Sequence, residues 1–239
     1  LEKLGFPSEL IFSGYDVVDN DYFSTQAAQA RHAPGQFQHL PGLNDPSPFF
    51  LASSRFVPRK NLDMLLRAYK SYSELAPSPW RLVILGDGPE RTGLQTLVDR
   101  EEITGVTFAG FRQVEELGAY YGLAAAFVHV ALVEQWGLVV NEAMAARLPV
   151  LVSQTTGCTH DLVVEGENGF RFDPSDTGML AQRMAQISSD PSARLCMSHR
   201  SQEIIANWPI ERFAEGLWQA LLAGSSRLDR PFNLAIRLA

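Results

Sequence analysis

The sequence is poor in cysteine, in net positive charge and in long apolar runs. Its 239 residues hold two cysteines, Cys158 and Cys196, without a CxxC pair or metal-site spacing, which favours reduced thiols in a cytosolic protein over a disulfide framework. The formal charge of −7 gives no overall field to attract nucleic acid or anionic lipid. No apolar run approaches the ~20 residues that span a bilayer, and no signal peptide is recognisable. An anionic ligand must therefore be held by a few local cations and backbone N–H groups, which favours a small molecule.

What the sequence does contain is a regular alternation of strand and helix patterns. The predicted strands are nearly continuous apolar runs, as in parallel strands covered on both faces; they are Phe49–Ser53, Arg81–Gly86, Val106–Ala109, Ala125–Ala131, Pro149–Ser153 and Gly169–Phe172. Helical patterns lie between them, the first beginning after Asn61, whose side chain suits a helix N-cap. The alternation predicts an α/β fold: a doubly wound, Rossmann-like parallel sheet with helices on both faces. Ligands of such a sheet bind beyond the carboxyl ends of its strands.

The two ends of the chain lack this alternation. We predict a linker or approach segment over residues 1–48, irregular over 24–48, where Gln, Ala and Pro are frequent. Residues 49–205 form the Rossmann-like domain, and residues 206–239 a closing helix and tail. Because the chain begins with Leu1 rather than Met, we expect it to be a piece of a longer protein.

Two carboxylates flank a predicted helix start in the segment EQWGLVVNEAMA, Glu134–Ala145. Gly137 allows a close backbone approach to a ligand, and the helix beginning near Leu138 directs free N–H groups and a positive dipole end to the same point. Glu134 before the helix and Glu142 one turn inside it could accept hydrogen bonds from sugar and ribose hydroxyls. The alternative is that glutamate is favoured near a helix N-terminus by the dipole alone.

A basic loop follows the first predicted strand and contains Arg55, Arg59 and Lys60. The guanidinium fork of Arg55 and the point charge of Lys60 suit a diphosphate. Taken alone, the same residues fit a solvated basic turn equally well.

Two other loops follow predicted strands. Gly86 and Gly88 permit a tight turn, and Pro89 suits the first position of a helix; as a phosphate loop the pattern is weak, and plain turn chemistry is the alternative. Phe111 and Arg112 follow the third strand and could meet a nucleobase, or Phe111 could belong to the core.

The histidines yield one candidate ligand contact. His129 lies inside an apolar strand, and we predict a hydrogen-bonded core residue there. His160 lies in the loop after the fifth strand, at the ligand edge, and is retained as a candidate. The sequence shows no Ser-His-Asp order, no HExxH and no Cys/His cluster, so no metal site is predicted.

Five motifs, in order, resemble the C-terminal domain of the retaining glycosyltransferases of family 4, which have the two-domain GT-B architecture. They are ASSRFVPRKNLDMLLRAY, LVILGDGPE, VTFAGF, EQWGLVVNEAMAARLPVLVS and GENGFRFDPSD, within about residues 50–190. Upstream, FSGYDVVDNDYF resembles the segment that enters this domain from the interdomain linker. The helix predicted over Ile210–Leu222 resembles the family's closing helix, which packs toward the N-terminal domain.

The resemblance implies a role for each candidate. Arg55 and Lys60 would hold the donor's diphosphate and stabilise its leaving charge, and Glu134 would bind donor-sugar hydroxyls; these three form the catalytic set. Glu142 would accept from the ribose hydroxyls. The remaining donor-binding residues comprise the floor of the site, the base loop and the backbone N–H groups around the helix start: Gly86, Gly88, Phe111, Arg112, Gln135, Trp136, Gly137, Leu138 and Val139.

The sequence departs from the family pattern in three places. Val130-Ala131 stand where a Pro-Ser pair is usual, and Arg147 stands where a glycine commonly precedes the Leu-Pro-Val strand start. The loop after Ser153 carries Cys158, His160 and Asp161 where small residues and a glutamate are usual. These departures bear on local packing and on the choice of donor sugar.

We therefore expect the donor half of a hexosyltransferase that binds a UDP- or GDP-sugar as substrate and needs no cofactor and no metal. Its partner would be an N-terminal acceptor domain lying outside this chain. Any peripheral membrane association would be made by that domain. Nucleic acid is not an expected partner. The location would be cytoplasmic; for the full-length protein, the inner face of the membrane is the alternative location. Two alternatives stay open: a non-catalytic domain that binds nucleotide-sugar or a partner chain, and a sugar-nucleotide epimerase, which the two-glutamate motif disfavours.

Overall fold

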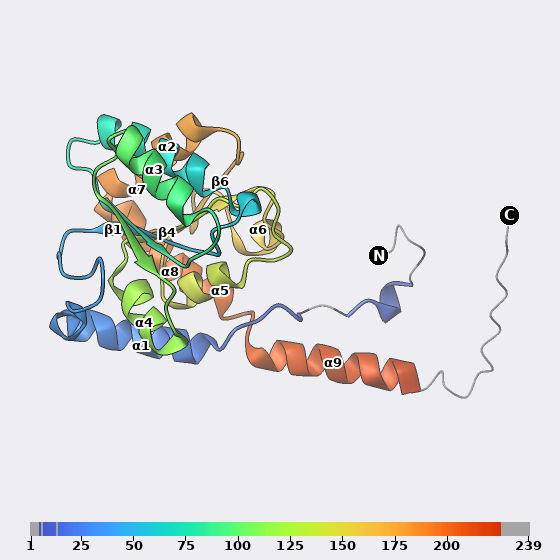
Figure 1. The fold of residues 1–239 in the computed structure, drawn as a ribbon. Helices are drawn as coiled ribbons and strands as arrows, with labels where there is room; N and C mark the ends of the chain where they lie inside the picture. The colour runs from blue at the N-terminus through green and yellow to red at the C-terminus, as the bar shows by residue number, and fades with distance from the viewer. Residues whose placement is uncertain (1–4, 6, 13, 226–239) are drawn as a thin grey trace, which may run out of the picture. The chain divides into compact units, whose positions relative to one another are not determined.

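The computed structural model describes residues 5, 7–12 and 14–225 of the chain (Figure 1). The chain divides into two units. The larger one, Val18–Asn207, contains all the described strands. The smaller one combines Leu1–Val17 with Trp208–Ala239, and its principal described element is helix α9, Ile210–Ser225.

The larger unit is built on a six-stranded sheet in the order β3-β2-β1-β4-β5-β6, with every neighbouring pair parallel. The strands are β1 (Phe49–Ser53), β2 (Arg81–Leu85), β3 (Val106–Gly110), β4 (Ala126–His129), β5 (Val150–Ser153) and β6 (Gly169–Phe172). The chain first builds outward from β1 to β3 and then returns to the other side of β1 for β4. The predicted doubly wound parallel sheet is therefore confirmed, and β1 and β6 have the predicted bounds.

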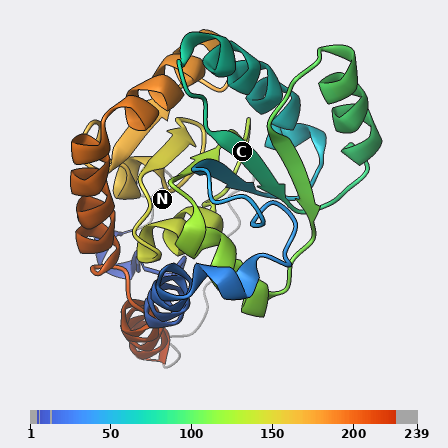
Figure 2. The same ribbon diagram turned by 90° about the vertical axis from the view of Figure 1, so that its left-hand side faces the viewer.

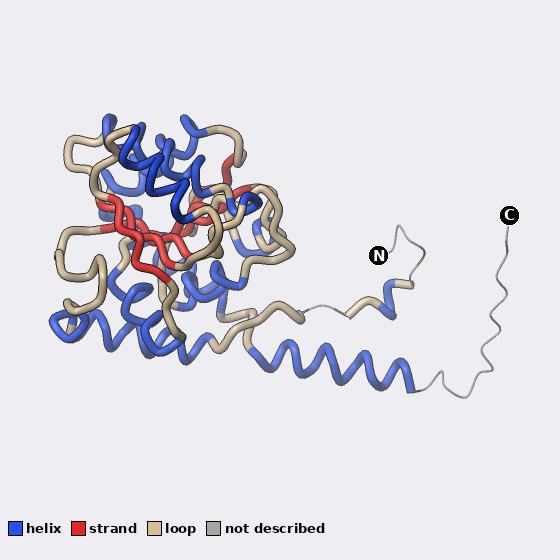
Figure 3. The backbone as a smooth tube through the Cα atoms, viewed as in Figure 1, coloured by secondary structure: helices blue, strands red, loops and turns tan. Residues whose placement is uncertain are grey.

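Helices cover both faces of the sheet, and Figures 2 and 3 show the strands running between two helical layers. One layer contains α2 (Leu62–Leu75), α3 (Arg91–Arg100) and α7 (Thr177–Ser189); the other contains α1 (Asn20–His32), α4 (Val114–Leu123) and α5 (Leu138–Ala145). Helix α8 (Pro191–Ile205) packs against α5 and α7, and α6 (Thr159–Leu162) is a single turn. Because both faces are covered, strand residues such as Leu51, Ile84 and Leu151 are fully buried, which explains the continuous apolar runs in the sequence.

Helix α1 corrects the prediction that residues 24–48 are irregular. It spans Asn20–His32, with the Asp19 carboxylate accepting a hydrogen bond from the N–H of Tyr22, and a 3₁₀ turn follows at Pro34–Phe37. Its buried face consists of Phe23, Ala27 and Ala30, so its apolar stripe is too weak to stand out in the sequence. These small residues let α1 lie close to α4, where a Cβ on Gly122 would come within 2.6 Å of the Ala27 carbonyl oxygen.

Two other local predictions concern the starts of helices. The helix expected from Pro89 begins at Arg91, because the chain first completes a turn in which the N–H of Arg91 donates to the carbonyl of Gly88 at 3.1 Å. The closing helix expected near Ile210 is present as α9, Ile210–Ser225, while residues 226–239 of the predicted tail lie outside the described part. Within the described part of the chain, no helix has the length and apolar character needed to cross a bilayer.

Candidate functional site

The candidate site lies where the strand order reverses, between β1 and β4. The carboxyl ends of parallel strands share one edge of the sheet, and a crevice opens where two neighbouring strands send their chains in opposite directions. Here β1 and β4 are paired neighbours that lead into the two most promising loops of the sequence. The loop after β1 carries Arg55 and Lys60, and the loop after β4 carries Glu134.

An ion pair between the Lys60 ammonium and the Glu134 carboxylate joins these two loops. Both side chains are largely buried, with 11% and 14% of their surfaces exposed. Burial, and then the charges of Arg59 and Arg55, lower the pKa of Lys60 to about 8. The loop after β1 thus concentrates three positive charges beside one largely buried carboxylate.

The left-handed conformation of Asn61 holds the basic turn in place. Asn61 has a φ of 58° and directly precedes α2, but its side chain does not cap that helix as predicted. Its amide instead donates to the carbonyls of Pro174 at 2.8 Å and Val130 at 3.2 Å. Asparagine is one of the few residue types that tolerates this conformation, and here it attaches the loop after β1 to the loop after β4.

Two glycines allow the Glu134 loop to fold tightly over the start of α5. Gly137 has a φ of 99°, a conformation that favours glycine, and a Cβ there would lie 2.9 Å from Cγ2 of Thr156. A Cβ on Gly157 would lie 1.8 Å from the carbonyl oxygen of Gln135. The two loops thus touch backbone to backbone, with the N–H of Gly157 donating to the carbonyl of Glu134 at 3.0 Å, and the first N–H groups of α5, at Leu138 and Val139, have no partner within the helix, as at any helix start.

His129 ends β4 directly beneath this loop. It is 3% exposed, and its Nε2 has no hydrogen-bond partner among the described residues; the nearest carboxylate oxygen, Oε2 of Glu134, is 3.7 Å away. Burial, with the nearby charge of Lys60, lowers the pKa of His129 to about 3, so the ring is neutral. His129 is a core residue as predicted. Its Nε2, however, does not make the predicted hydrogen bond.

Glu142 has a partner that the sequence did not reveal. The hydroxyl of Tyr121, in α4, donates to Oε2 of Glu142 at 2.6 Å. Burial raises the pKa of Glu142 although this hydrogen bond opposes the rise, and the pKa of Tyr121 is raised by burial and by the Glu142 charge. Since Tyr121 lies 21 residues upstream in an apolar helix segment, only the tertiary fold, in which its ring packs against Phe127 of β4, brings the pair together.

The glycines after β2 contact the loop after β1. A Cβ on Gly86 would lie 1.8 Å from the carbonyl oxygen of Ser54, and one on Gly88 would lie 2.5 Å from that of Phe56. The N–H of Phe56 donates to the carbonyl of Asp87 at 2.9 Å. These contacts shape the base of the loop that carries Arg55, whose side chain is exposed.

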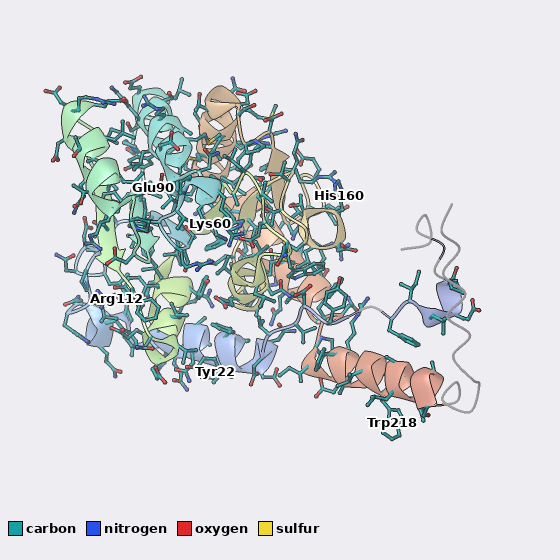
Figure 4. All side chains as sticks on the ribbon, turned by 45° about the vertical axis from the view of Figure 1, so that its right-hand side comes forward. Tyr22, Lys60, Glu90, Arg112, His160 and Trp218 are labelled. Atoms are coloured by element: carbon teal, nitrogen blue, oxygen red, sulfur yellow. The ribbon has the colours of Figure 1, made fainter. Side chains whose placement is uncertain are left out.

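The remaining candidates come from other loops, and Figure 4 labels Arg112 and His160 on opposite sides of Lys60 in that view. Phe111 follows β3 and is 67% exposed. The neighbouring Arg112 guanidinium donates to the Ala109 carbonyl and pairs with Glu116 at 3.1 Å, so it stabilises the turn. His160 is exposed in the short helix α6.

The arrangement brings together Arg55, Lys60, Glu134 and the start of α5, with Glu142 one turn further along. A cationic loop facing a buried carboxylate and free helix N–H groups can hold a phosphorylated sugar: the cations contact the phosphates and the carboxylate accepts from hydroxyls. Among the described residues, no group of three His, Cys, Asp or Glu side chains could hold a metal ion.

Residues 37–204 match the protein-family model described as "Glycosyl transferases group 1". Among curated proteins, the GDP-mannose-dependent alpha-(1-6)-phosphatidylinositol monomannoside mannosyltransferase of Mycolicibacterium smegmatis is 28% identical over 200 residues, which cover 80% of this chain and 50% of that protein. The chain spans about half the length, or less, of the curated relatives that it matches.

Two solved structures show the same fold. Anabaena HepE in complex with UDP and glucose superposes with a TM-score of 0.74 at 20% identity, covering 93% of this chain and 59% of that one. The C-terminal domain of LpcC, a glycosyl transferase group 1 family protein from Francisella tularensis, superposes with a TM-score of 0.63 at 19% identity, covering 80% of this chain and 97% of that one. The sheet is thus the Rossmann-like α/β fold of GT-B glycosyltransferases.

Proposed function

The chain belongs to the group 1 glycosyltransferases, and we propose that its sheet unit binds the nucleoside-diphosphate sugar from which a full-length enzyme transfers a hexose. The observation that carries this proposal is the buried Lys60–Glu134 pair, which joins the loops after β1 and β4 where the strand order of the sheet reverses. Two relatives point the same way, since one is named as GDP-mannose-dependent and the other was solved with UDP and glucose.

The diphosphate of the donor would contact the cationic loop. The exposed Arg55 offers a guanidinium fork, and Lys60 a point charge at the edge of the crevice. A diphosphate there would offset the mutual repulsion of Arg55, Arg59 and Lys60. In the transition state the same cations would stabilise the charge that develops on the leaving group.

The sugar and ribose would lie along the start of α5. Glu134 would accept from donor-sugar hydroxyls while Lys60 holds its carboxylate in place, and N–H groups from Gln135 to Val139 would meet the sugar and phosphate. Glu142, oriented by Tyr121, would accept from the ribose hydroxyls. The exposed ring of Phe111 would stack on the base, with Arg112 fixing the turn beneath it.

We further propose that transfer retains the anomeric configuration, the leaving diphosphate assisting the acceptor on the same face of the sugar. This needs no cofactor and no metal, because Arg55, Lys60 and helix N–H groups supply the positive charge. The acceptor would be held by an N-terminal domain, and the protein would act in the cytoplasm, with membrane association running through that domain.

Helix α9 has the character expected of a segment that contacts such a domain. Its exposed apolar side chains recur at helical spacing, at Ile210, Phe213, Leu217, Trp218 and Leu221, and Figure 4 labels Trp218 on the surface of this helix. A continuous apolar stripe on an exposed helix normally packs against another structure.

Calorimetry of the 239-residue chain with UDP-glucose and GDP-mannose tests the donor site. We expect weak binding of at least one donor, weakened about 10- to 100-fold by Lys60→Ala or Glu142→Ala, the range for a lost hydrogen bond to a charged group. Arg67→Ala, which removes a surface cation paired with Glu101, is the matched control and should bind like the natural chain. We also expect no release of UDP or GDP from the donor by this chain alone.

Absence of donor binding, or binding that Lys60→Ala and Glu142→Ala leave unchanged, would contradict the site. Turnover of the donor by the isolated chain would contradict only the division of the active site between two domains.

A further inference from the structure

The amino edge of the sheet, opposite the proposed donor site, carries a second cluster of cations around a cavity of about 490 Å³. It is bounded by the residues that precede β4 and β5, by the last turn of α1 and by the first turns of α8. Three arginines line it, Arg31, Arg147 and Arg194, with Ser198 beside them. A neighbouring hollow of about 400 Å³ shares Arg31 and Arg147.

Backbone carbonyls, a histidine and an aromatic ring contact these guanidinium ions. Arg31 donates to the carbonyl of Ala146, and Arg147 contacts Nδ1 of His199 at 2.9 Å. Arg194 lies over the ring of Trp80, 4.8 Å from its centroid, and donates to the carbonyl of Ile187 at 3.2 Å. Among the described residues, no carboxylate oxygen lies within ion-pair distance of the three.

The positive charges therefore act on one another. Burial, and then the charge of Arg147, lower the pKa of Arg31. Asp190 acts on Arg194 from a distance, but its side chain caps α8 by accepting from the N–H of Ala193 at 2.9 Å. In a chain with a net charge of −7, a cavity lined by three arginines, none of them ion-paired with a carboxylate among the described residues, is an uncompensated site.

The backbone at Arg147 adds a second argument. Arg147 follows the end of α5 with a φ of 61°, at the left-handed position where glycine normally ends a helix. The N–H of Leu148 bonds back to the carbonyl of Ala143 at 3.0 Å, as in a glycine-terminated helix. An arginine here costs free energy that a glycine would not, and what it adds is a cationic side chain in the lining of the cavity.

We propose that this arginine cavity binds the phosphate group of a small phosphorylated molecule. Guanidinium forks match phosphate oxygens, whereas the Ser198 hydroxyl already donates to the Arg194 carbonyl at 3.0 Å. Ala124, Ala125, Leu148 and Leu195 supply an apolar wall for the carbon body of the ligand. The volume lies within the range of roughly 300–1,000 Å³ typical of small-molecule sites and exceeds what a phosphate alone would fill.

The test titrates the 239-residue chain with glycerol 3-phosphate at constant ionic strength, with glycerol as the uncharged control. We expect Arg147→Gly and Arg194→Gln to weaken binding at least tenfold. Arg147→Gly is the decisive variant, because it relieves the left-handed strain and should fold at least as well as the natural chain. Arg67→Gln, a surface arginine, and Lys60→Gln, in the proposed donor site, should leave binding unchanged.

Equal weakening by Lys60→Gln would place the phosphate at the donor edge and overturn the proposal. So would binding that Arg147→Gly and Arg194→Gln leave intact, or no binding by the natural chain. A lipid headgroup offers the same chemistry, so phosphatidylcholine vesicles with and without phosphatidylglycerol form a second arm. Binding to the anionic vesicles without binding to glycerol 3-phosphate would overturn the small-molecule ligand. The proposal does not depend on the donor site.

Discussion

The two edges of the sheet gather positive charge in opposite ways. At the carboxyl edge, Lys60 is paired with Glu134, and the loops around them are fixed by glycines and by the amide of Asn61. At the amino edge, Arg31, Arg147 and Arg194 face a cavity and are held by carbonyls, a histidine and an aromatic ring.

The two sites differ in whether a carboxylate lies among their cations. A buried carboxylate beside a lysine gives a site that can contact both phosphates and hydroxyls, because it offers donors and an acceptor together. Guanidiniums without a carboxylate suit an anion alone. Helix α5 connects the two, since Gly137 begins it at the carboxyl edge and Arg147 follows its other end.

Gly157→Ala should produce the largest change at the carboxyl edge. Its Cβ would lie 1.8 Å from the carbonyl oxygen of Gln135, so the backbone of the Glu134 loop must move. We expect a loss of about 3 kcal/mol in the free energy of unfolding, measured by urea denaturation, together with loss of donor binding. Gly93→Ala in α3, where a Cβ meets nothing within 4 Å, should instead stabilise by about 1 kcal/mol. Similar effects of both variants would show that the loop is not tightly packed.

The neutral ring of His129 should make the carboxyl edge sensitive to acid. Because its pKa in the folded chain is about 3 and that of an unfolded histidine is about 6.5, the unfolded state binds the extra proton, and stability falls as the pH drops below about 6.5. Between pH 7 and pH 5 this costs about 2 kcal/mol. His129→Gln should lose that part of the pH dependence in denaturation curves. His160→Gln, an exposed histidine at the same edge, serves as the control; an unchanged pH dependence in His129→Gln would disprove the buried neutral ring.

Ligand binding at the two sites should respond differently to alkaline pH, because one site relies on a lysine and the other on arginines. The pKa of Lys60 is about 8, below its ordinary value, so the free chain loses this charge as the pH rises through that value. Donor binding should then weaken up to about tenfold between pH 7 and pH 9, with proton uptake on binding, measurable by calorimetry in buffers of different ionisation enthalpy. Lys60→Arg should remove the pH dependence. Glycerol 3-phosphate binding at the arginine cavity should not change, because arginine stays protonated; parallel loss at both sites would contradict this distinction.

The sequence predicts the sheet well and the contacts across it poorly. All six strands were predicted, because burial on both faces leaves continuous apolar runs such as Phe49–Ser53. Helix α1 was missed, because its buried face rests on Ala27 and Ala30, which carry little apolar signal. The positions of Arg55, Glu134 and Glu142 at the carboxyl edge follow from strand order, whereas their binding roles remain predictions.

Partners from distant segments could not be foreseen. Tyr121 meets Glu142, and Asn61 meets the Pro174 carbonyl, only through the packing of separate elements. Arg147 stood out in the sequence as a departure from glycine, but nothing local indicated that α1 and α8 would bring Arg31 and Arg194 beside it. One-dimensional patterns record burial and local conformation, whereas the cavity is formed by contacts between elements that are distant in the sequence.

The smallest predicted effect compares two strained positions and isolates the charge at the amino edge. Arg147 and Glu102 are non-glycine residues with left-handed φ angles of 61° and 52°, so Arg147→Gly and Glu102→Gly should each relieve about 1 kcal/mol of backbone strain. Glu102 is exposed at the end of α3 and touches no part of the cavity. Arg147→Gly also removes the repulsion between Arg147 and Arg31, so in thermal denaturation at low salt it should stabilise more than Glu102→Gly. Added phosphate should reverse that order, because the natural chain then gains a bound anion that Arg147→Gly cannot hold. If the order is the same with and without phosphate, Arg147 serves the end of α5 and not the cavity.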